Sequence, residues 1–497
     1  MTFGDGLLVA TLALPAAGAI AVALLRATRW AGALGTAAAA LTLVTSALLY
    51  ADRGESWFGY TDGAPAVLPW HSVRADWAPG LNLQFHIGVD GISYPLVVLT
   101  TLLTLLCCGY TWRRGERNAL IALLLVIEVG IVGTFLALDL VLFFVFFEVV
   151  LLPMYAVIAV WGGERRRPAA RKFVLYTLLG SVLLLVGVFV VTAAAGTADI
   201  VALTGGSGLA RTTQLVGFTF FALAFAVKSP LWPLHTWLPD AHTEAPTVGS
   251  VILAGVLLKM GTYGLIRIGL GVTPEGAAWA APVLATLAVA AIVIGALVCL
   301  AQTELKRLIA YSSVGHMGFV LLGIATLTAA GLQAALIGNL AHGVITSLLF
   351  FLAGAVKERA GTGELARLGG LRETAPALAG VLGFAAIASL GLPGLAGFWG
   401  EFFAVVAAIQ RDGAWWTVLG VVAAIGAAIT AGYFLRLLRR VSHGPAVGTV
   451  DPPGLARVEL AAWSPLILLA LLLGLLPVLV LGMAYDPVGA LAAVVTR

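Results

Sequence analysis

The segment Ala226-Val-Lys228-Ser-Pro230-Leu-Trp-Pro233 decides how this chain folds. It places a lysine and two prolines inside an apolar run, and about 20 such residues cross a bilayer as a helix. Proline removes a backbone donor and clashes with the preceding turn, so we expect the helix to break beside Lys228. A charge at the centre of a membrane helix costs roughly 2.5–3.5 kcal/mol on insertion scales. Because a lysine at this position is so unfavourable, its presence indicates that it has a function.

A second apolar stretch has the same character. Residues 376–410 exceed the length of one membrane helix, and their middle reads Gly391-Leu-Pro393-Gly394-Leu-Ala-Gly397. Glycine supplies the freedom to unwind beside the proline, which predicts a second broken helix. The two broken segments are the seventh and twelfth apolar spans. Two five-helix units in succession must be inverted because five is odd, and paired broken helices in inverted repeats are typical of transporters.

The composition is that of a polytopic membrane protein. Of 497 residues, 61% are hydrophobic and only 10% are charged, against about 25% charged in soluble domains. We predict an all-α membrane fold with about 14 transmembrane helices, discontinuous at helices 7 and 12. The expected spans begin near residues 5, 31, 91, 118, 140, 170, 214, 247, 277, 305, 332, 376, 414 and 458.

The chain is expected to form a single membrane domain, 1–497. Within it we expect three N-terminal helices in 5–112, a first inverted repeat over 118–270, a second over 277–440 and a last helix over 458–483. The one long loop, 51–89, is polar and contains Trp57, Trp70 and Trp77. We interpret this loop as a small cap outside the membrane.

The distribution of Lys and Arg predicts the orientation. Twenty of the 28 fall in the loops that follow the odd-numbered spans, and six fall on the side that carries both termini. Loops rich in Lys and Arg stay in the cytoplasm. We therefore expect a multi-pass inner (cell) membrane protein with both termini on the outer, periplasmic side.

Six more ionisable residues lie inside predicted spans: Glu128, Glu148, Lys259, His316, His342 and Glu401. Such groups usually mark an ion or proton pathway. Glu148 lies nine residues past Asp139, about 13 Å along a helix and so near the midplane. An acid and a base at similar depth can pair, and a charge arriving nearby would break the pair. This favours a switch made of Glu148 and Lys228.

Each of these residues also has a structural interpretation. Glu148 could be a protonated acid that is hydrogen-bonded to a neighbouring helix, and each histidine could be a satisfied core residue. Lys259 lies about ten residues from either end of its span, too far to reach the interface, and a lysine taken out of water can exchange a proton. Glu401 follows the second break as the inverted counterpart of Lys228. Glu128 has two open interpretations, a modulator of the Glu148–Lys228 pair or a hydrogen-bonded structural acid.

Other motifs point away from metal and redox chemistry. His235, Asp240 and His242 follow the first break, at the expected cytoplasmic edge, but their spacing matches no metal motif. Cys107, Cys108 and Cys299 lie in apolar spans without metal-ligand spacing. No phosphate-binding, nucleic-acid, dinucleotide, CxxC or haem-ligating motif is present in the sequence.

At these residues the chain resembles the antiporter-like subunits of respiratory complex I and of Mrp-type multisubunit Na+/H+ antiporters. Lys228-Ser-Pro-Leu-Trp-Pro-Leu-His-Thr-Trp-Leu-Pro-Asp-Ala-His242 and Lys306-Arg-Leu-Ile-Ala-Tyr-Ser-Ser-Val-Gly-His316 are similar to the two family signatures. The subunit-4 (chain M) type fits best, on Gly88-Val-Asp-Gly-Ile-Ser93, on Phe144-Val-Phe-Phe-Glu148 and on the glutamate in Gly397-Phe-Trp-Gly-Glu401. The resemblance runs from about Gly88 to the chain end.

The resemblance implies a role for each buried group. Glu148 and Lys228 would be the coupling ion pair, and Lys259 the central proton site. His316 and His342 would form the bridge, and Glu401 would be the outlet. The function expected is proton translocation in the membrane arm of an NADH–quinone oxidoreductase, of which the chain would be a non-redox subunit.

Cofactors and partners follow from the same resemblance. We expect no cofactor to be bound to this chain. We expect NADH, FMN, iron–sulfur clusters and quinone to bind to partner subunits. The expected partners are other membrane-arm subunits and lipid, with no nucleic acid. Two alternatives stay open: a subunit of an Mrp-type Na+/H+ antiporter, and a scaffold that forms part of a quinone or lipid site.

Overall fold

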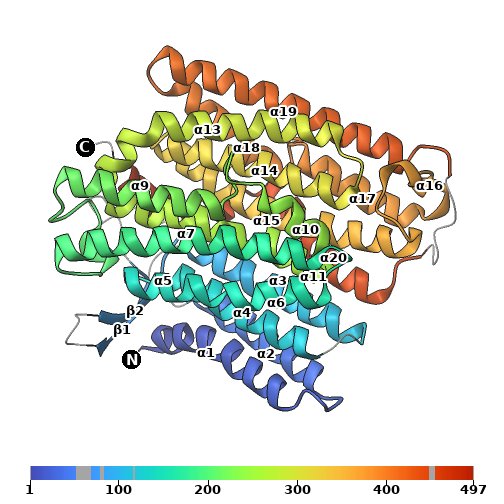
Figure 1. Ribbon diagram of the computed structural model, residues 1–497, viewed down its shortest axis with the longest axis horizontal. Helices are drawn as coiled ribbons and strands as arrows, with labels where there is room; N and C mark the ends of the chain where they lie inside the picture. The colour runs from blue at the N-terminus through green and yellow to red at the C-terminus, as the bar shows by residue number, and fades with distance from the viewer. Residues whose placement is uncertain (1, 52–68, 79–82, 116–117, 447–453, 496–497) are drawn as a thin grey trace.

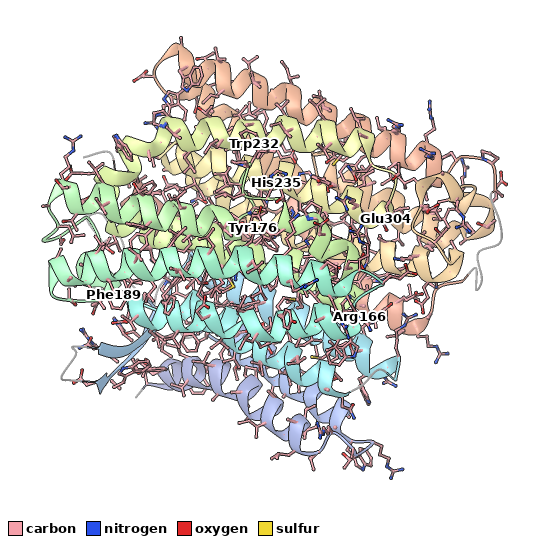
Figure 2. The ribbon with its side chains drawn as sticks, viewed as in Figure 1. Arg166, Tyr176, Phe189, Trp232, His235 and Glu304 are labelled. Carbon is pink, nitrogen blue, oxygen red and sulfur yellow. The ribbon has the colours of Figure 1, made fainter. Side chains whose placement is uncertain are left out.

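A computed structural model describes residues 2–51, 69–78, 83–115, 118–446 and 454–495. Its helices run side by side in one bundle, with a short β-hairpin at one end (Figure 1). Arg166 and Glu304 lie at the opposite end from the hairpin, and Phe189 lies toward the hairpin end (Figure 2). Arg166 and Phe189 belong to one helix, Arg166–Ala195, which therefore runs along the bundle between these two ends.

The first half of the chain forms the helices that precede and include the first break. They are α1 (Phe3–Leu24), α2 (Ala31–Leu48), α3 (Tyr94–Arg113), α4 (Asn118–Leu136), α5 (Leu140–Val149), α6 (Leu151–Trp161), α7 (Arg166–Ala195), α8 (Ile200–Leu203), α9 (Arg211–Lys228) and α10 (Trp237–Glu244). The next span is one continuous rod of alternating α- and π-helix: α11 (Thr247–Ile252), η2 (Leu253–Leu257), α12 (Leu258–Gly264) and η3 (Leu265–Leu270).

The second half is built from long helices and a second break. They are α13 (Pro274–Ala301), α14 (Leu305–Ala325), α15 (Ala329–Ala360), the 3₁₀ turn η4 (Leu365–Arg367), α16 (Leu371–Thr374), α17 (Pro376–Ser389), α18 (Ala396–Gln410), α19 (Ala414–Val441), α20 (Arg457–Leu475), α21 (Val478–Leu481) and α22 (Tyr485–Val495). The last expected helix, 458–483, is thus interrupted after Leu475, where Pro477 follows within two residues.

The loop expected as a polar cap contains the β-hairpin. Strands β1 (His71–Ala78) and β2 (Leu83–Val89) pair antiparallel, with His71 opposite Val89. Trp70 and Trp77 lie in or beside it, whereas Trp57 lies outside the described residues. The expected loop thus contains two short strands that the sequence analysis did not predict, because strands with alternating side chains do not register as apolar runs.

The predicted spans agree well with the structure. Among the described residues, twelve helices are long and apolar enough to cross a membrane. Their first residues fall within a few positions of the expected starts. The two other expected spans are the broken ones, α9–α10 and α17–α18. The count of about fourteen and the inverted repeats remain predictions.

Both helix breaks lie where the prolines and glycines predict them. In the first, Ser229 N–H donates to Phe225 O (2.8 Å), and the indole of Trp237 donates to Val227 O (3.0 Å). These bonds satisfy carbonyls that the end of α9 would otherwise leave unpaired in an apolar surrounding. In the second, Gly391 and Gly394 adopt positive φ values of 79° and 90°, a conformation that costs glycine little.

The most buried span is the one that carries Lys259. Every residue from Val248 to Leu270 is buried. The span packs against α15 through glycine: a Cβ added at Gly343 would lie 2.7 Å from Gly255 O, and one at Gly255 would lie 2.6 Å from Ser347 Oγ. Helices can approach this closely only where no side chain intervenes. The centre of the bundle is therefore a tight contact between α15 and the π-bulged span.

A buried ion pair fixes the hairpin end of the same span. Arg267 Nη2 lies 2.5 Å from Asp90 Oδ2, with side chains 2% and 4% exposed. The second carboxylate oxygen of Asp90 accepts from Ile92 N and Ser93 N. The pair thus ties the loop before α3 to the lysine-bearing span.

Replacing Arg267 by methionine should destabilise the protein by about 3–5 kcal/mol, because it leaves the Asp90 carboxylate buried and unpaired. Adding Asp90→Asn, which keeps the acceptor for Ile92 and Ser93, should recover most of that loss. Unfolding in detergent measures both. Stability of the single variant within about 0.5 kcal/mol of the parent would contradict the pairing.

Candidate functional site

Lys259 is held in the middle of the bundle by two contacts. Its Nζ donates to Ala254 O at 2.6 Å and lies 2.6 Å from Nδ1 of His342. Lys259 is fully buried and His342 is 5% exposed. The π-helical turn η2 precedes the lysine, and such turns are frequent at functional sites. A buried amine with an imidazole as neighbour can pass a proton to it.

A second polar contact fixes the register of the same two helices. One turn after the lysine, Thr262 Oγ1 donates to Asn339 Oδ1 at 3.0 Å. Both side chains are fully buried, and Asn339 Nδ2 has no partner among the described residues. The contact between α12 and α15 is therefore anchored by a hydrogen bond beside the Lys259–His342 pair.

His342 faces His316 on the neighbouring helix α14. The ring centroids are 6.0 Å apart, and Nε2 of His342 has no partner among the described residues. A cavity of about 20 Å³ is lined by both histidines, by Ser389 and by Glu401. A space of that size admits about one water molecule. A single water can therefore complete the connection between the rings.

His316 is bonded on both ring nitrogens. Nδ1 lies 2.7 Å from Glu401 Oε1, and Nε2 lies 3.0 Å from the hydroxyl of Ser389. Ser389 is the last residue of α17, and a Cβ at Gly391 would lie 3.1 Å from Glu401 Oε2. The second helix break thus brings a hydroxyl, a glycine backbone and a carboxylate together around one imidazole.

These four groups lie one after another, with direct contacts at both ends and a 6.0 Å ring-to-ring step between the histidines. The order in space is Lys259, His342, His316 and Glu401, on α12, α15, α14 and α18. The histidines thus occur in the reverse of their order along the chain. The sequence interpretation placed these four residues in one line but put His316 before His342, whereas His342 lies beside Lys259 and His316 beside Glu401.

Glu148 and Lys228 are close enough to interact electrostatically, but within the described residues they form no ion pair. The Glu148 carboxylate accepts the hydroxyl of Ser181 on α7. The Lys228 ammonium lies 4.4 Å from the centroid of the Phe147 ring, a cation–π contact, and forms no ion pair within the described part of the chain. The Glu148–Lys228 ion pair therefore stays a prediction. In this structure Glu148 contacts Ser181, and Lys228 contacts Phe147.

Glu128 lies apart from the series. It is fully buried in α4, and neither carboxylate oxygen has a partner among the described residues. The interpretation of Glu128 as a hydrogen-bonded structural acid therefore finds no hydrogen-bond partner among the described residues.

The histidines and aspartate after the first break do not converge on one point. Asp240 pairs with Lys172 (2.7 Å) and Arg307 (3.3 Å), while His242 stacks on Phe350 with centroids 4.4 Å apart. Across the described residues, no group of three or more His, Cys, Asp or Glu is placed to hold a metal. His235 lies near the middle of the bundle rather than at its edge, because α9 ends halfway along the axis (Figure 2).

Sequence reasoning missed three polar residues at the site: Ser181, Ser389 and Asn339. Asn339 precedes His342 by three residues, a helical spacing that places both on one face. Ser389 immediately precedes the second break, and that position was a usable signal. Ser181 lies in an ordinary apolar run, and its sequence context contains no such signal.

Comparison with known proteins points to one family. The family model described as NADH:quinone oxidoreductase/Mrp antiporter, transmembrane, matches residues 137–426. NADH-quinone oxidoreductase subunit M of Rhodobacter capsulatus is 40% identical over 458 residues, which cover 86% of this chain and 89% of that protein. NAD(P)H-quinone oxidoreductase chain 4 of a Synechococcus species is also 40% identical, over 88% of this chain and 86% of the relative.

Solved structures show the same fold. A chain of respiratory complex I from Thermus thermophilus with bound NADH superposes with a TM-score of 0.86 at 32% identity, covering 98% of this chain and 99% of that one. A chain of the Mrp complex from a Dietzia species has a TM-score of 0.84 at 23% identity, with 99% and 97% covered. The second likeness concerns the fold alone.

The geometry around His316 makes a direct spectroscopic prediction. Ser389→Ala removes the hydroxyl beside Nε2, so the ¹⁵N resonance of that nitrogen should shift while Nδ1 stays bonded to Glu401. Histidine-labelled protein, with His316 assigned through His316→Gln, allows the measurement. Ser347→Ala is a matched control, since its hydroxyl is equally buried but bonds Val251 O. An Nε2 resonance unmoved by Ser389→Ala would show that the contact does not form.

Proposed function

Because this chain belongs to the family of NADH:quinone oxidoreductase and Mrp antiporter membrane subunits, we propose that it moves protons in the membrane arm of an NADH–quinone oxidoreductase. The single observation that carries the proposal is the buried series Lys259–His342–His316–Glu401. The subunit M/chain 4 relatives favour complex I over the antiporters, as does the glutamate at position 401.

The series has the chemistry of a proton relay. Each member can bind and release a proton, and two of its three steps are contacts of 2.6 and 2.7 Å. Proton transfer needs a donor and an acceptor within hydrogen-bond reach, directly or through one water. The third step, between the histidine rings, runs past the cavity that both line. Lys259 loads the proton, the histidines carry it, and Glu401 receives it.

Glu148 and Lys228 supply the coupling in this proposal. Lys228 ends α9 beside the unwound segment, and Glu148 lies on α5, which packs against α7. A salt bridge between them would replace the Ser181 and Phe147 contacts seen here. Opposite charges attract strongly where water is excluded, so forming or breaking that bridge changes the field at Lys259. In the structure described here the two side chains form no ion pair with each other.

Direction follows from the charge distribution. Protons would enter from the side that carries most of the Lys and Arg, which we assign to the cytoplasm. They would leave by Glu401, which is 12% exposed, either to the outside or to a neighbouring subunit. Both chain termini would then lie on the outer side of the inner membrane.

We assign the redox chemistry to partner subunits. NADH, FMN, iron–sulfur clusters and quinone would bind there, since this sequence has no motif for them. Cys107, Cys108 and Cys299 are all buried, the first two on α3 and the third on α13, which is not the four-cysteine arrangement of a cluster. The chain is then a non-redox subunit of a proton-translocating oxidoreductase, with other membrane-arm subunits as partners.

The alternative is a subunit of an Mrp-type Na+/H+ antiporter. The Dietzia likeness shows that this fold also occurs there, but it carries no functional argument at 23% identity. Measurements of pH change in vesicles distinguish the antiporter from the NADH-driven pump. A pH change that depends on sodium and not on NADH would favour the antiporter.

Glu148→Ala or Lys228→Ala should lower NADH-driven proton pumping by at least about tenfold while the complex still assembles. The physical reason is that either change removes one member of the charge pair without touching the relay. Pumping is measured in vesicles that contain the assembled complex, with subunit content checked by mass spectrometry. Near-normal pumping and quinone reduction in an assembled Glu148→Ala complex would contradict the coupling role.

A further inference from the structure

A second, larger cavity opens at the end of the bundle marked by Arg166. Its volume is about 780 Å³, within the range of about 300–1,000 Å³ that small ligands occupy. The ends of α3 and α6 and the starts of α7, α11 and α14 surround it, with the last turns of α15. Its lining residues are Arg114, Gly115, Val160, Trp161, Arg166, Pro246, Thr247, Lys306, Gly354, Lys357 and Glu358. No member of the proton series lies among them.

The lining is strongly cationic. It contains four basic side chains and a single acid, and that acid, Glu358, pairs with Arg114 at 2.7 Å. The other three cations, Arg166, Lys306 and Lys357, form no ion pair within the described part of the chain. The carboxylates of Glu244 and Glu304, which lie outside the lining, act on Lys306 and offset part of its charge. The three cations still outnumber these two acids, so the lining attracts an anion.

Lys306 is the least expected of the three. It is only 5% exposed, and one of its three ammonium protons bonds Ala245 O at 2.8 Å. Burying a charge that keeps two donors free is costly unless a ligand accepts from them. Arg166 and Lys357 lie at the more open rim, where a guanidinium can bind phosphate oxygens in pairs. The donors therefore match a phosphate group.

The surroundings of the cavity identify the kind of phosphate. Val160, in its lining, is 52% exposed, and two earlier residues of α6, Tyr155 (37%) and Leu152 (71%), are exposed as well. This apolar strip runs from the cavity along the helix, in the direction that an acyl chain takes from its headgroup. Trp161, at the strip's cationic end, is a residue typical of the membrane interface. A free phosphate would need no such strip.

We propose that this cavity binds the phosphodiester headgroup of an anionic phospholipid, such as phosphatidylglycerol, with an acyl chain along α6. Lys306 and Lys357 hold the phosphate from the floor and one side, and Arg166 closes the rim. Basic pockets between transmembrane helices at this depth favour anionic lipids. The lipid then fills the wedge between α6, α11 and α15, next to the span that bears Lys259.

The test compares two double variants of the whole purified complex. Arg166→Gln with Lys357→Gln removes two rim charges, and Arg439→Gln with Arg440→Gln removes two exposed charges from the last turn of α19. Mass spectrometry counts the phosphatidylglycerol retained per complex. We expect about one molecule fewer in the first variant than in the parent, and no loss in the second. Equal retention in both would overturn the site.

A second measurement distinguishes lipid from soluble phosphate and uses the parent protein. The melting temperature should rise in nanodiscs that contain phosphatidylglycerol, compared with phosphatidylcholine alone. Inorganic phosphate added to the phosphatidylcholine discs should not reproduce the rise; if it does, the lipid assignment is wrong. A photoreactive phosphatidylglycerol should label α6 at Leu152, Tyr155 or Val160. Labelling confined to other helices would likewise contradict the proposal, even if the charge variants fail to assemble.

Discussion

The contact between the ammonium of Lys259 and the imidazole of His342 is the constraint on which the rest of the structure depends. A fully buried amine must find polar partners, and here it finds one carbonyl and one ring nitrogen. The surrounding features serve that contact. Two π-helical turns flank the lysine, glycines let α15 approach within reach, and a Thr262–Asn339 bond sets the register. A small change in the approach of these helices would separate the amine from its acceptor.

The buried polar groups are interrupted at two places. Both interruptions would prevent protons from leaking through the subunit without control. The histidine rings are 6.0 Å apart, with a cavity of about one water between them. Glu148 and Lys228 hold separate partners on α7 and α5. A pump must connect its relay to one side at a time, so interruptions that close only in certain states are required. The helix breaks place the polar groups at these gaps: α9 ends at Lys228, and the second break brings Ser389 and Glu401 to His316.

The sequence predicted the local features and missed the contacts between helices. The span starts and both breaks follow from hydropathy, proline and glycine, which act on neighbouring residues. The alternation in Gln84-Phe-His-Ile-Gly-Val89 is typical of a strand, but the segment is too short and too polar to form an apolar run. The order of the histidines depends on which helices lie side by side, and spacing along the chain does not determine that. The separation of Glu148 from Lys228 depends on Ser181 and Phe147, whose side-chain positions are set by tertiary packing. Lys306, counted with the loops, is in fact buried.

The most direct measurement of the relay is the number of protons moved per NADH oxidised in vesicles that contain the whole complex with His342→Gln. Glutamine keeps a polar side chain of similar length but cannot accept a proton from Lys259 and pass it on. His443→Gln, at an exposed position after α19, is the control. A relay through His342 predicts that the ratio falls in the first variant and is unchanged in the second. An unchanged ratio in an assembled His342→Gln complex would show that protons do not travel along this series.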